Sequence, residues 1–232
     1  MGEAAREPMY EAVIFDVDGL IVDTEEIYCR TFNETLGVYG VSLTRRDYTV
    51  CVGHPVAQNC EYAVEEYGLD VSPEFICGAW MGRFEEAISD PDGVPLMPGI
   101  LDLLAHVRRR GYLLGIASST ERARMETTLQ NGLLSRLSDV ESLDEVFVAI
   151  LSGSDVEQIK PAPDIYLLAA ERLGTQPERC VVFEDSEAGV RAAKGAGMTV
   201  IAVPNFFTEH QDHTGADVIL AELSEAVSGE HV

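Results

Sequence analysis

The chain has 232 residues, of which 46% are hydrophobic, so it can form one large domain or a core with a small insert. Its 40 acidic residues face only 16 Lys and Arg, and the resulting net charge of −24 repels nucleic acids and anionic membranes. No stretch reaches the roughly 20 consecutive apolar residues of a membrane span, so we expect neither nucleic acid nor membrane as a partner.

Cysteine usage and the first residues predict a cytoplasmic protein. The five cysteines are scattered and odd in number, which favours reduced thiols over a disulfide framework. Residues 1–8 are polar and contain two glutamates, whereas a secretory signal begins with basic residues and an apolar run. The acidic surface is typical of a solvated shell suited to a high-salt cytoplasm.

Short apolar runs along the chain predict buried strands. They cover residues 12–15, 112–117, 146–151, 180–183 and 199–203, and residues 218–220 form a candidate sixth strand. Helical patterns lie between the later runs, over residues 100–110, 164–173 and 187–196, and each is followed by a glycine. This alternation predicts an α/β fold, a Rossmann-like doubly wound parallel sheet with helices on both faces.

One region breaks the alternation. Residues 25–87 have helical patterns and no convincing buried strand, and turn-rich stretches precede and follow them. We therefore predict a helical cap over residues 23–92, inserted into a core formed by residues 1–22 and 93–232. The cap would cover the end of the first strand, which is where open α/β sheets bind ligands.

Polar residues follow four of the predicted strands. Because the carboxyl ends of parallel strands meet at one edge of a sheet, we expect these side chains to converge. The residues are Asp16 and Asp18 after the first strand, Ser118 and Ser119 after the second, Lys160 beyond the third, and Glu184 and Asp185 after the fourth.

These residue types suit phosphoryl transfer, which proteins catalyse mainly by positioning and charge stabilisation. Asp16 and Asp185 are carboxylates of the kind that hold Mg²⁺ together with a phosphate. Lys160, one of only two lysines in the chain, would place a cation on the phosphate, and Ser118 would donate a hydrogen bond to it.

The two aspartates of the first motif can have different tasks. Gly19 lets the chain turn directly after Asp18, so the two side chains need not face the same way. One of them can attack phosphorus while the other exchanges a proton with the leaving oxygen.

Each motif taken alone has a simpler interpretation. Asp16 to Gly19 also fits a turn or the start of a calcium loop, although residues 20–22 are apolar where a calcium loop has further acids. Ser118 and Ser119 alone fit a helix N-cap, and Lys160 alone fits a surface lysine. Their occurrence after successive strands favours the joint functional interpretation.

With these motifs the sequence resembles the haloacid dehalogenase-like hydrolases. The resemblance covers about residues 12–203 and is strongest to the branch with a small helical cap, which includes β-phosphoglucomutase and sugar-phosphate phosphatases. The motifs that carry it are DVDGLIVDT at 16–24, IASS at 116–119, KPAPD at 160–164 and EDS at 184–186, with Gly189.

The resemblance implies a role for each motif residue. Asp16 would form an aspartyl-phosphate and bind Mg²⁺, and Asp18 would be the general acid and base, with its backbone carbonyl on the metal. The phosphate would be held by Ser118, the amide of Ser119 and Lys160. Asp185 would complete the metal site, with Glu184 as a further or indirect ligand.

The resemblance also narrows the activity. Asp18 argues against a dehalogenase, and the absence of lysine from the predicted cap argues against a phosphonate hydrolase. Similar mutases have a linker histidine near the position of Tyr28, and an arginine soon after a cap glycine, where this chain has His54 after Gly53. We expect a Mg²⁺-dependent phosphatase of small phosphorylated metabolites, such as sugar phosphates. The alternatives are a hexose-phosphate mutase and a catalytically silent binding or regulatory protein.

Two cap residues are candidates for substrate contact. His54 could reach the leaving group, or could be a surface histidine in a turn. Arg83, on a predicted cap helix, could bind a second anionic group, or could be solvated. Outside the cap, the acidic stretch 135–145 is predicted to be a surface insertion.

Overall fold

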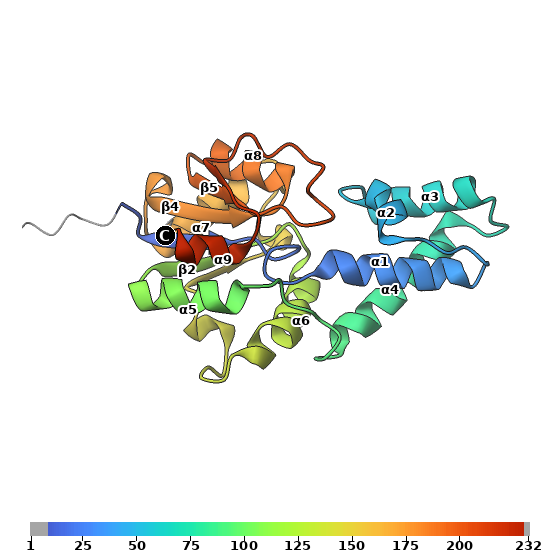
Figure 1. Cartoon of the computed structure of the whole chain (residues 1–232), viewed down its shortest axis with the longest axis horizontal. Coiled ribbons are helices and arrows are strands. Elements are labelled where there is room, and N and C mark those ends of the chain that lie inside the picture. The colour runs from blue at the N-terminus through green and yellow to red at the C-terminus, as the bar shows by residue number, and fades with distance from the viewer. Residues whose placement is uncertain (1–8, 230–232) are drawn as a thin grey trace, which may run out of the picture.

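The computed structural model describes residues 9–229, which form an α/β core and a helical cap at one end of the core (Figure 1). The prediction that residues 1–8 form no secretory signal concerns residues outside those that the structure describes. Among the helices of residues 9–229, none has the length and apolar character needed to cross a membrane.

The core is built on one sheet of six parallel strands in the order β3-β2-β1-β4-β5-β6. Strands β2 and β3 lie on one side of β1, and β4, β5 and β6 lie on the other. The order of the strands therefore switches between β1 and β4, and doubly wound sheets bind ligands at such a switch point. The predicted fold class is therefore confirmed. The strands are β1 (Ala12–Phe15), β2 (Leu113–Ala117), β3 (Ala149–Leu151), β4 (Cys180–Glu184), β5 (Thr199–Ala202) and β6 (Val218–Ile219).

The start of β3 differs from the prediction. The other strands end within one residue of their predicted limits, but β3 begins at Ala149 and not at residue 146. A 3-10 turn, η3 (Leu143–Glu145), precedes it, closed by a capping box between Ser142 and Glu145. Val146 continues this turn in a helical backbone conformation, and Phe147 is buried in the core. The apolar run therefore becomes a strand only at Ala149.

Helices cover both faces of the sheet because alternate side chains of each strand point to opposite faces. Ala12 and Ile14 pack with α7 (Asp164–Leu173) and α8 (Glu187–Gly195). Val13 and Phe15 point to the other side, into the larger cluster. That cluster includes residues of α5 (Ile100–Arg110), α6 (Arg122–Gly132) and α9 (Leu223–Ser228).

The cap contains no strand among the described residues and has its own hydrophobic cluster. Trp80 lies in this cluster and is 1% exposed, and its ring nitrogen donates to the Tyr28 carbonyl and the Thr31 hydroxyl, both at 3.1 Å. These bonds satisfy the polar end of a buried indole. The cap helices are α1 (Thr24–Gly37), α2 (Arg45–Tyr48), α3 (Val56–Tyr67) and α4 (Pro73–Ser89).

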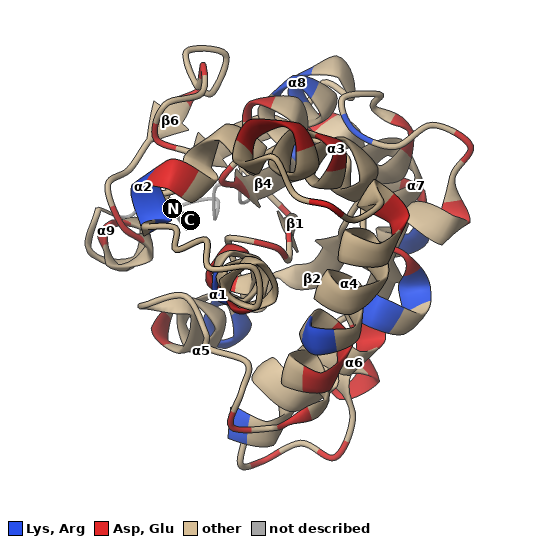
Figure 2. Ribbon diagram, turned by 90° about the vertical axis from the view of Figure 1, so that its right-hand side faces the viewer, with Lys and Arg blue, Asp and Glu red and all other residues tan. Residues whose placement is uncertain are grey.

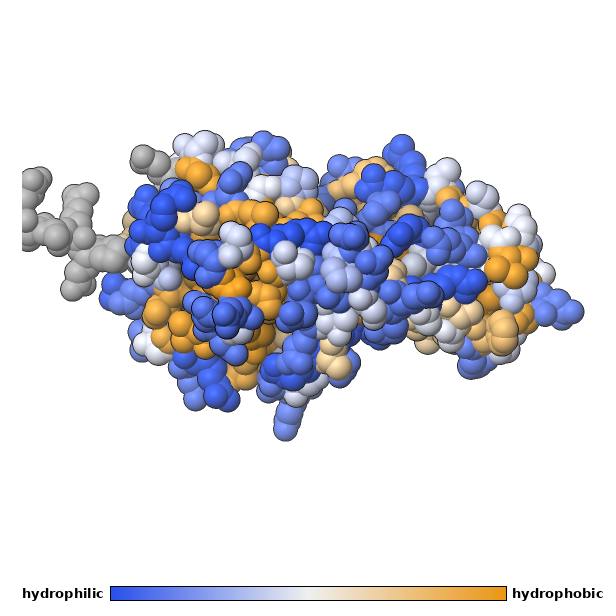
Figure 3. All heavy atoms as spheres, turned by 90° about the horizontal axis from the view of Figure 1, so that it is seen from below, coloured by the Kyte–Doolittle hydropathy of each residue, from blue (hydrophilic) through white to orange (hydrophobic). Residues whose placement is uncertain are grey.

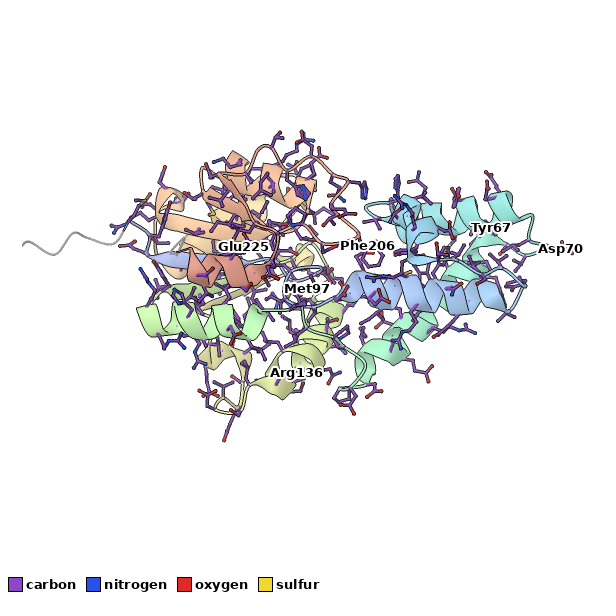
Figure 4. The ribbon with its side chains drawn as sticks, viewed as in Figure 1. Tyr67, Asp70, Met97, Arg136, Phe206 and Glu225 are labelled. Carbon is purple, nitrogen blue, oxygen red and sulfur yellow. The ribbon has the colours of Figure 1, made fainter. Side chains whose placement is uncertain are left out.

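The two linkers between core and cap lie side by side. Val22 and Leu96 form an antiparallel bridge. The Met97 amide donates to the Ile21 carbonyl at 2.9 Å, and Figure 4 labels Met97 at this junction. The chain thus enters and leaves the cap at one place, while the exact domain limits stay a prediction.

Charge and apolar residues are unevenly spread over the surface. Acidic residues lie on both cap and core elements (Figure 2). From below, hydrophilic residues cover much of the molecule, with apolar residues showing between them on the core half and at the far end of the cap (Figure 3). The stretch 135–145 lies at the surface, where Leu137, Val140 and Leu143 pack against the core.

A pair of glycine substitutions tests the packing of α6 against the linkers. A Cβ at Gly132 would lie 2.8 Å from methyl groups of both Val22 and Val94, whereas a Cβ at Gly82 would meet nothing within 4 Å. We expect Gly132→Ala to lower the free energy of unfolding by about 1–3 kcal/mol because it overpacks this site. Gly82→Ala should raise it by about 0.5–1 kcal/mol by removing a flexible residue from a helix. Urea denaturation measures both, and a Gly132→Ala protein as stable as Gly82→Ala would contradict the packing argument.

Candidate active site

The predicted motif residues meet at the carboxyl edge of the sheet. Asp16 follows β1, Glu184 ends β4 and Asp185 follows it, and each offers a carboxylate oxygen within 4.8 Å of the others. They lie beside a cavity of about 310 Å³ between the core and the cap. Its lining includes Asp16, Asp18, Ser119, Lys160 and Asp185, together with Glu25, Val52, Gly53, Thr120, Thr208 and Gln211.

Lys160 is the buried cation of this site. Its ammonium donates to Asp16 Oδ1, to Glu184 Oε1 at 2.6 Å and to the Ala117 carbonyl at 2.9 Å. The side chain is only 5% exposed, so three acceptors replace its water. The structure therefore brings Lys160 directly to the predicted nucleophile.

Glu184 holds Lys160 in place. Its Oε1 also accepts from the Tyr166 hydroxyl at 2.6 Å, and its Oε2 accepts from the Asp185 amide and the Ser186 hydroxyl, both at 3.1 Å. A Cβ at Gly189 would lie 1.8 Å from Oε1, so the carboxylate packs directly on this glycine. Both carboxylate oxygens are thus engaged by protein donors.

The site holds more buried carboxylates than cations. Burial raises the pKa of Asp16 well above its usual range, against the opposing charge of Lys160, and burial likewise raises the pKa of Asp185. Burial opposes the charged form of Lys160, but Asp16 and Glu184 raise its pKa well above the usual value. A second cation would relieve the remaining negative charge, and an all-oxygen donor set fits Mg²⁺.

Asp18 is held by hydroxyl groups. Thr24 Oγ1 donates to Oδ1 at 2.9 Å, and Thr120 and Ser118 donate to Oδ2 at 2.8 and 3.0 Å. These bonds fix the carboxylate between the first turn of α1 and the segment after β2. The Ser118 hydroxyl, predicted to hold phosphate, is therefore bonded to Asp18 and the residue is fully buried, while Ser119 lines the cavity.

The two cap candidates lie in different places. His54 is exposed and directly follows Val52 and Gly53, which line the cavity. Arg83 lies away from the site, beside a separate cavity lined by Arg30 and several acidic residues, and donates to the Ala79 carbonyl at 3.3 Å. Consecutive side chains of a helix point in directions about 100° apart. Because the neighbouring Phe84 is buried, Arg83 points away from that buried face.

Glu25 is a cavity residue that the sequence did not reveal. It lies half-buried in the first turn of α1 and accepts a hydrogen bond from the Tyr48 hydroxyl at 3.2 Å. Burial raises its pKa to about 7, with the negative charges of Asp18 and Asp23 adding to the effect. Acidic residues are common in the first turn of any helix, so the sequence gives no separate signal for this role.

A doubly wound sheet with a buried carboxylate and lysine cluster beneath a helical cap defines a class of α/β hydrolase. The sequence matches the haloacid dehalogenase-like hydrolase family over residues 13–203, and the chain belongs to this family. The family resemblance predicted from the motifs is confirmed.

Known relatives match nearly the whole chain. Protein CbbY of Cereibacter sphaeroides is 36% identical over 223 residues, 94% of each chain. Fructose-1-phosphate phosphatase YqaB of Escherichia coli is 32% identical, covering 84% of this chain and 96% of its own. A crystal structure of CbbY from Rhodobacter sphaeroides with xylulose-1,5-bisphosphate has a TM-score of 0.70 and 32% identity, over 94% of this chain and 96% of that one. The prediction of a phosphoric monoester hydrolase is confirmed at this level.

The raised pKa of Glu25 predicts a signed pH dependence of stability. Between the usual value of 4.5 and about 7, the folded chain keeps a proton that the unfolded chain has lost. The stabilising effect of this proton is complete below the unfolded pKa and is lost as the pH rises through the folded one. The stability of wild type relative to Glu25→Gln should therefore fall as the pH rises, measured by urea midpoints from about pH 5 to about pH 8.

Asp47 provides the control for this measurement. It is fully exposed, and hydrogen bonds from Thr44 lower its pKa from 3.8. Its carboxylate is thus charged in both states over the same pH range, and the stability difference for Asp47→Asn should stay flat. A flat difference for Glu25→Gln as well would contradict the assignment of a raised pKa to Glu25.

Proposed function

We propose that the chain is a Mg²⁺-dependent phosphatase of small phosphorylated metabolites, in particular sugar phosphates, that acts through an aspartyl-phosphate on Asp16. The observation that carries the proposal is the contact between Asp16 and the buried Lys160 beside the cavity. A volume of about 310 Å³ suits a small substrate. The relatives named for fructose-1-phosphate and crystallised with xylulose-1,5-bisphosphate support the substrate class.

The metal ligands in this proposal are Asp16 and Asp185, with the backbone carbonyl of Asp18. Glu184 is close enough to take part, but both of its oxygens already accept from protein donors, so we assign it to hold Lys160. When bound, Mg²⁺ supplies positive charge that draws together the phosphate and the carboxylates around it.

The residues of the chain account for both halves of hydrolysis. Lys160 and the Ser119 amide hold the phosphate while an Asp16 oxygen attacks phosphorus. The bond between phosphorus and the leaving oxygen breaks as protonated Asp18 gives that oxygen its proton. Asp18 then takes a proton from water, whose oxygen attacks phosphorus and releases inorganic phosphate from Asp16. The hydroxyls of Thr24 and Thr120 keep Asp18 aimed for both proton transfers.

Ser118 and His54 remain proposed substrate contacts. The Ser118 hydroxyl donates to Asp18 and accepts from the Thr120 amide at 3.0 Å, so it reaches phosphate only by exchanging the bond to Asp18. His54 is exposed and directly follows Gly53, which lines the cavity, and we propose that from there it meets the leaving group. Arg83, beside its separate cavity, plays no part in this proposal.

Tyr28 favours hydrolysis over transfer between two positions of a sugar. Its ring stacks on Phe84 with centroids 3.8 Å apart, and burial raises its pKa above the usual value of a phenol. A hydroxyl that keeps its proton is a poor proton-exchange partner for Asp18 near neutral pH. We therefore propose that water is the acceptor of the phosphoryl group.

Replacement of the nucleophile tests the proposal. Asp16→Asn should reduce phosphate release from sugar phosphates by at least about 10³-fold, because loss of a nucleophile removes the covalent route. The exposed Asp102 on α5 provides the control, and Asp102→Asn should keep full activity. Phosphate release is measured across a panel of phosphate esters, and full activity of Asp16→Asn would refute the aspartyl-phosphate.

Metal removal and product analysis separate the alternatives. Chelation with EDTA should abolish phosphate release, and added Mg²⁺ should restore it, because the buried carboxylates then regain their counter-charge. Product analysis with a hexose phosphate should give free phosphate, and isomer formation stimulated by a bisphosphate without net phosphate release would establish the mutase. A chain that binds Mg²⁺ but hydrolyses no compound of the panel would be a silent member of the family.

A further inference from the structure

The loop after β5 contributes a side chain to the candidate metal site. Asn205 Nδ2 donates to Asp185 Oδ2 at 2.9 Å and to the Gly19 carbonyl at 3.0 Å. An amide nitrogen carries two hydrogens, so both bonds form at once. Asn205 therefore ties the motif that follows β1 to the carboxylate that follows β4, across the switch point of the sheet.

The space around this amide is closed. A Cβ at Gly19 would lie 2.3 Å from Asp185 Oδ2 and 2.8 Å from Asn205 Nδ2. Gly19 also has a φ of +81°, which disfavours any larger residue. Asp185 thus has one well-defined position, with glycine on one side and the Asn205 amide on the other. Thr208 adds a longer contact to the same oxygen at 3.4 Å.

The same loop is anchored in the cap. Phe207 is fully buried in the hydrophobic cluster of the cap, although it belongs to a core loop. Its ring meets that of Tyr48 edge to face, with centroids 5.9 Å apart. The Arg45 guanidinium of α2 lies 4.6 Å from the Phe206 ring centroid and 5.1 Å from that of Phe207. Figure 4 shows Phe206 at this junction between core and cap.

A backbone bond connects the anchor to the amide. The Phe207 amide donates to Asn205 Oδ1 at 2.8 Å, and this bond fixes which end of the Asn205 side chain faces Asp185. The Asn205 backbone in turn donates to Thr208 Oγ1 at 3.0 Å. Displacement of Phe207 with the cap would therefore rotate or withdraw the amide that holds Asp185.

We propose that Asn205 is a positioning residue for the Asp185 carboxylate, and that Phe207 makes this positioning depend on the seating of the cap on the core. The inference rests on the proposed function, because it assigns Asp185 to the metal. It links two equilibria: a seated cap favours Mg²⁺ binding, and bound Mg²⁺ favours a seated cap by the same factor. Seating of the cap and assembly of the metal site would thus favour each other.

Titration calorimetry with MgCl₂ alone, on the full chain without substrate, tests the proposal. Asn205→Ala should weaken Mg²⁺ binding by about 10–100-fold, the usual effect of losing a residue that orients a metal ligand. Phe207→Ala should weaken it by at least about 5-fold through the loop, although the side chain touches no carboxylate. The loss should be recovered in part by Phe207→Leu, which keeps the apolar contact with the cap.

Phe206→Ala is the matched control. Phe206 is the preceding residue, contacts the same arginine and meets the Phe207 ring edge to face with centroids 5.2 Å apart, but it is 42% exposed and lies outside the buried cap cluster. Its removal should leave Mg²⁺ affinity within about 2-fold of wild type, since no bond connects its side chain to Asn205 among the described contacts. Melting temperatures of all variants, measured without Mg²⁺, identify any variant that is simply unfolded.

Specific results would overturn the inference. An unchanged Mg²⁺ affinity in Asn205→Ala refutes the positioning role, and equal affinities in folded Phe207→Ala and Phe206→Ala refute the coupling to the cap. Wild-type chain that binds no Mg²⁺ refutes this inference together with the metal part of the proposed function. Wild-type chain that binds Mg²⁺ but releases no phosphate refutes the phosphatase alone, because the binding data still decide the role of Asn205.

Discussion

The site depends on one buried ammonium group surrounded by carboxylates. Removing Lys160 and its partners from water is costly, and the attraction between them compensates only where geometry and further hydrogen bonds are good. The core supplies that geometry: Glu184 is fixed by Tyr166 and by the turn after β4, and the Ala117 carbonyl takes a further ammonium hydrogen. The buried carboxylates of Asp16 and Asp185 leave negative charge that a second cation would balance, and this is where we propose that Mg²⁺ binds.

The parts of the fold that the sequence predicts well are those set by local pattern. Buried parallel strands read as short apolar runs, and the absence of such runs marks the cap. The start of β3 was missed because Val146 and Phe147 are apolar for another reason: they pack on the core at the end of a 3-10 turn. Apolar character alone does not distinguish a buried turn from a buried strand.

For the site, position after a strand was the useful signal, since it placed Asp16, Lys160 and Asp185 at one edge. The site residues that were not predicted have side chains with a more ordinary explanation. Tyr166 occupies a core position of α7, and Asn205 lies in a polar loop. For Arg83 the sequence left two interpretations open, because the rotation of a cap helix about its axis relative to the cavity is set by packing that sequence spacing does not specify. The structure places Arg83 beside a separate cavity.

The paired linkers have a consequence for how such enzymes diversify. Since Ile21 and Met97 are already joined by a hydrogen bond, the cap departs from and returns to nearly the same point of the core. A short turn could span that gap, so the connection itself sets no fixed length for the segment inserted between the two linkers. Recombination can then exchange one cap for another and change which molecules are admitted, provided that the new cap still supplies the contacts this core uses, such as the Thr24 hydroxyl on Asp18 and the apolar cluster that receives Phe207.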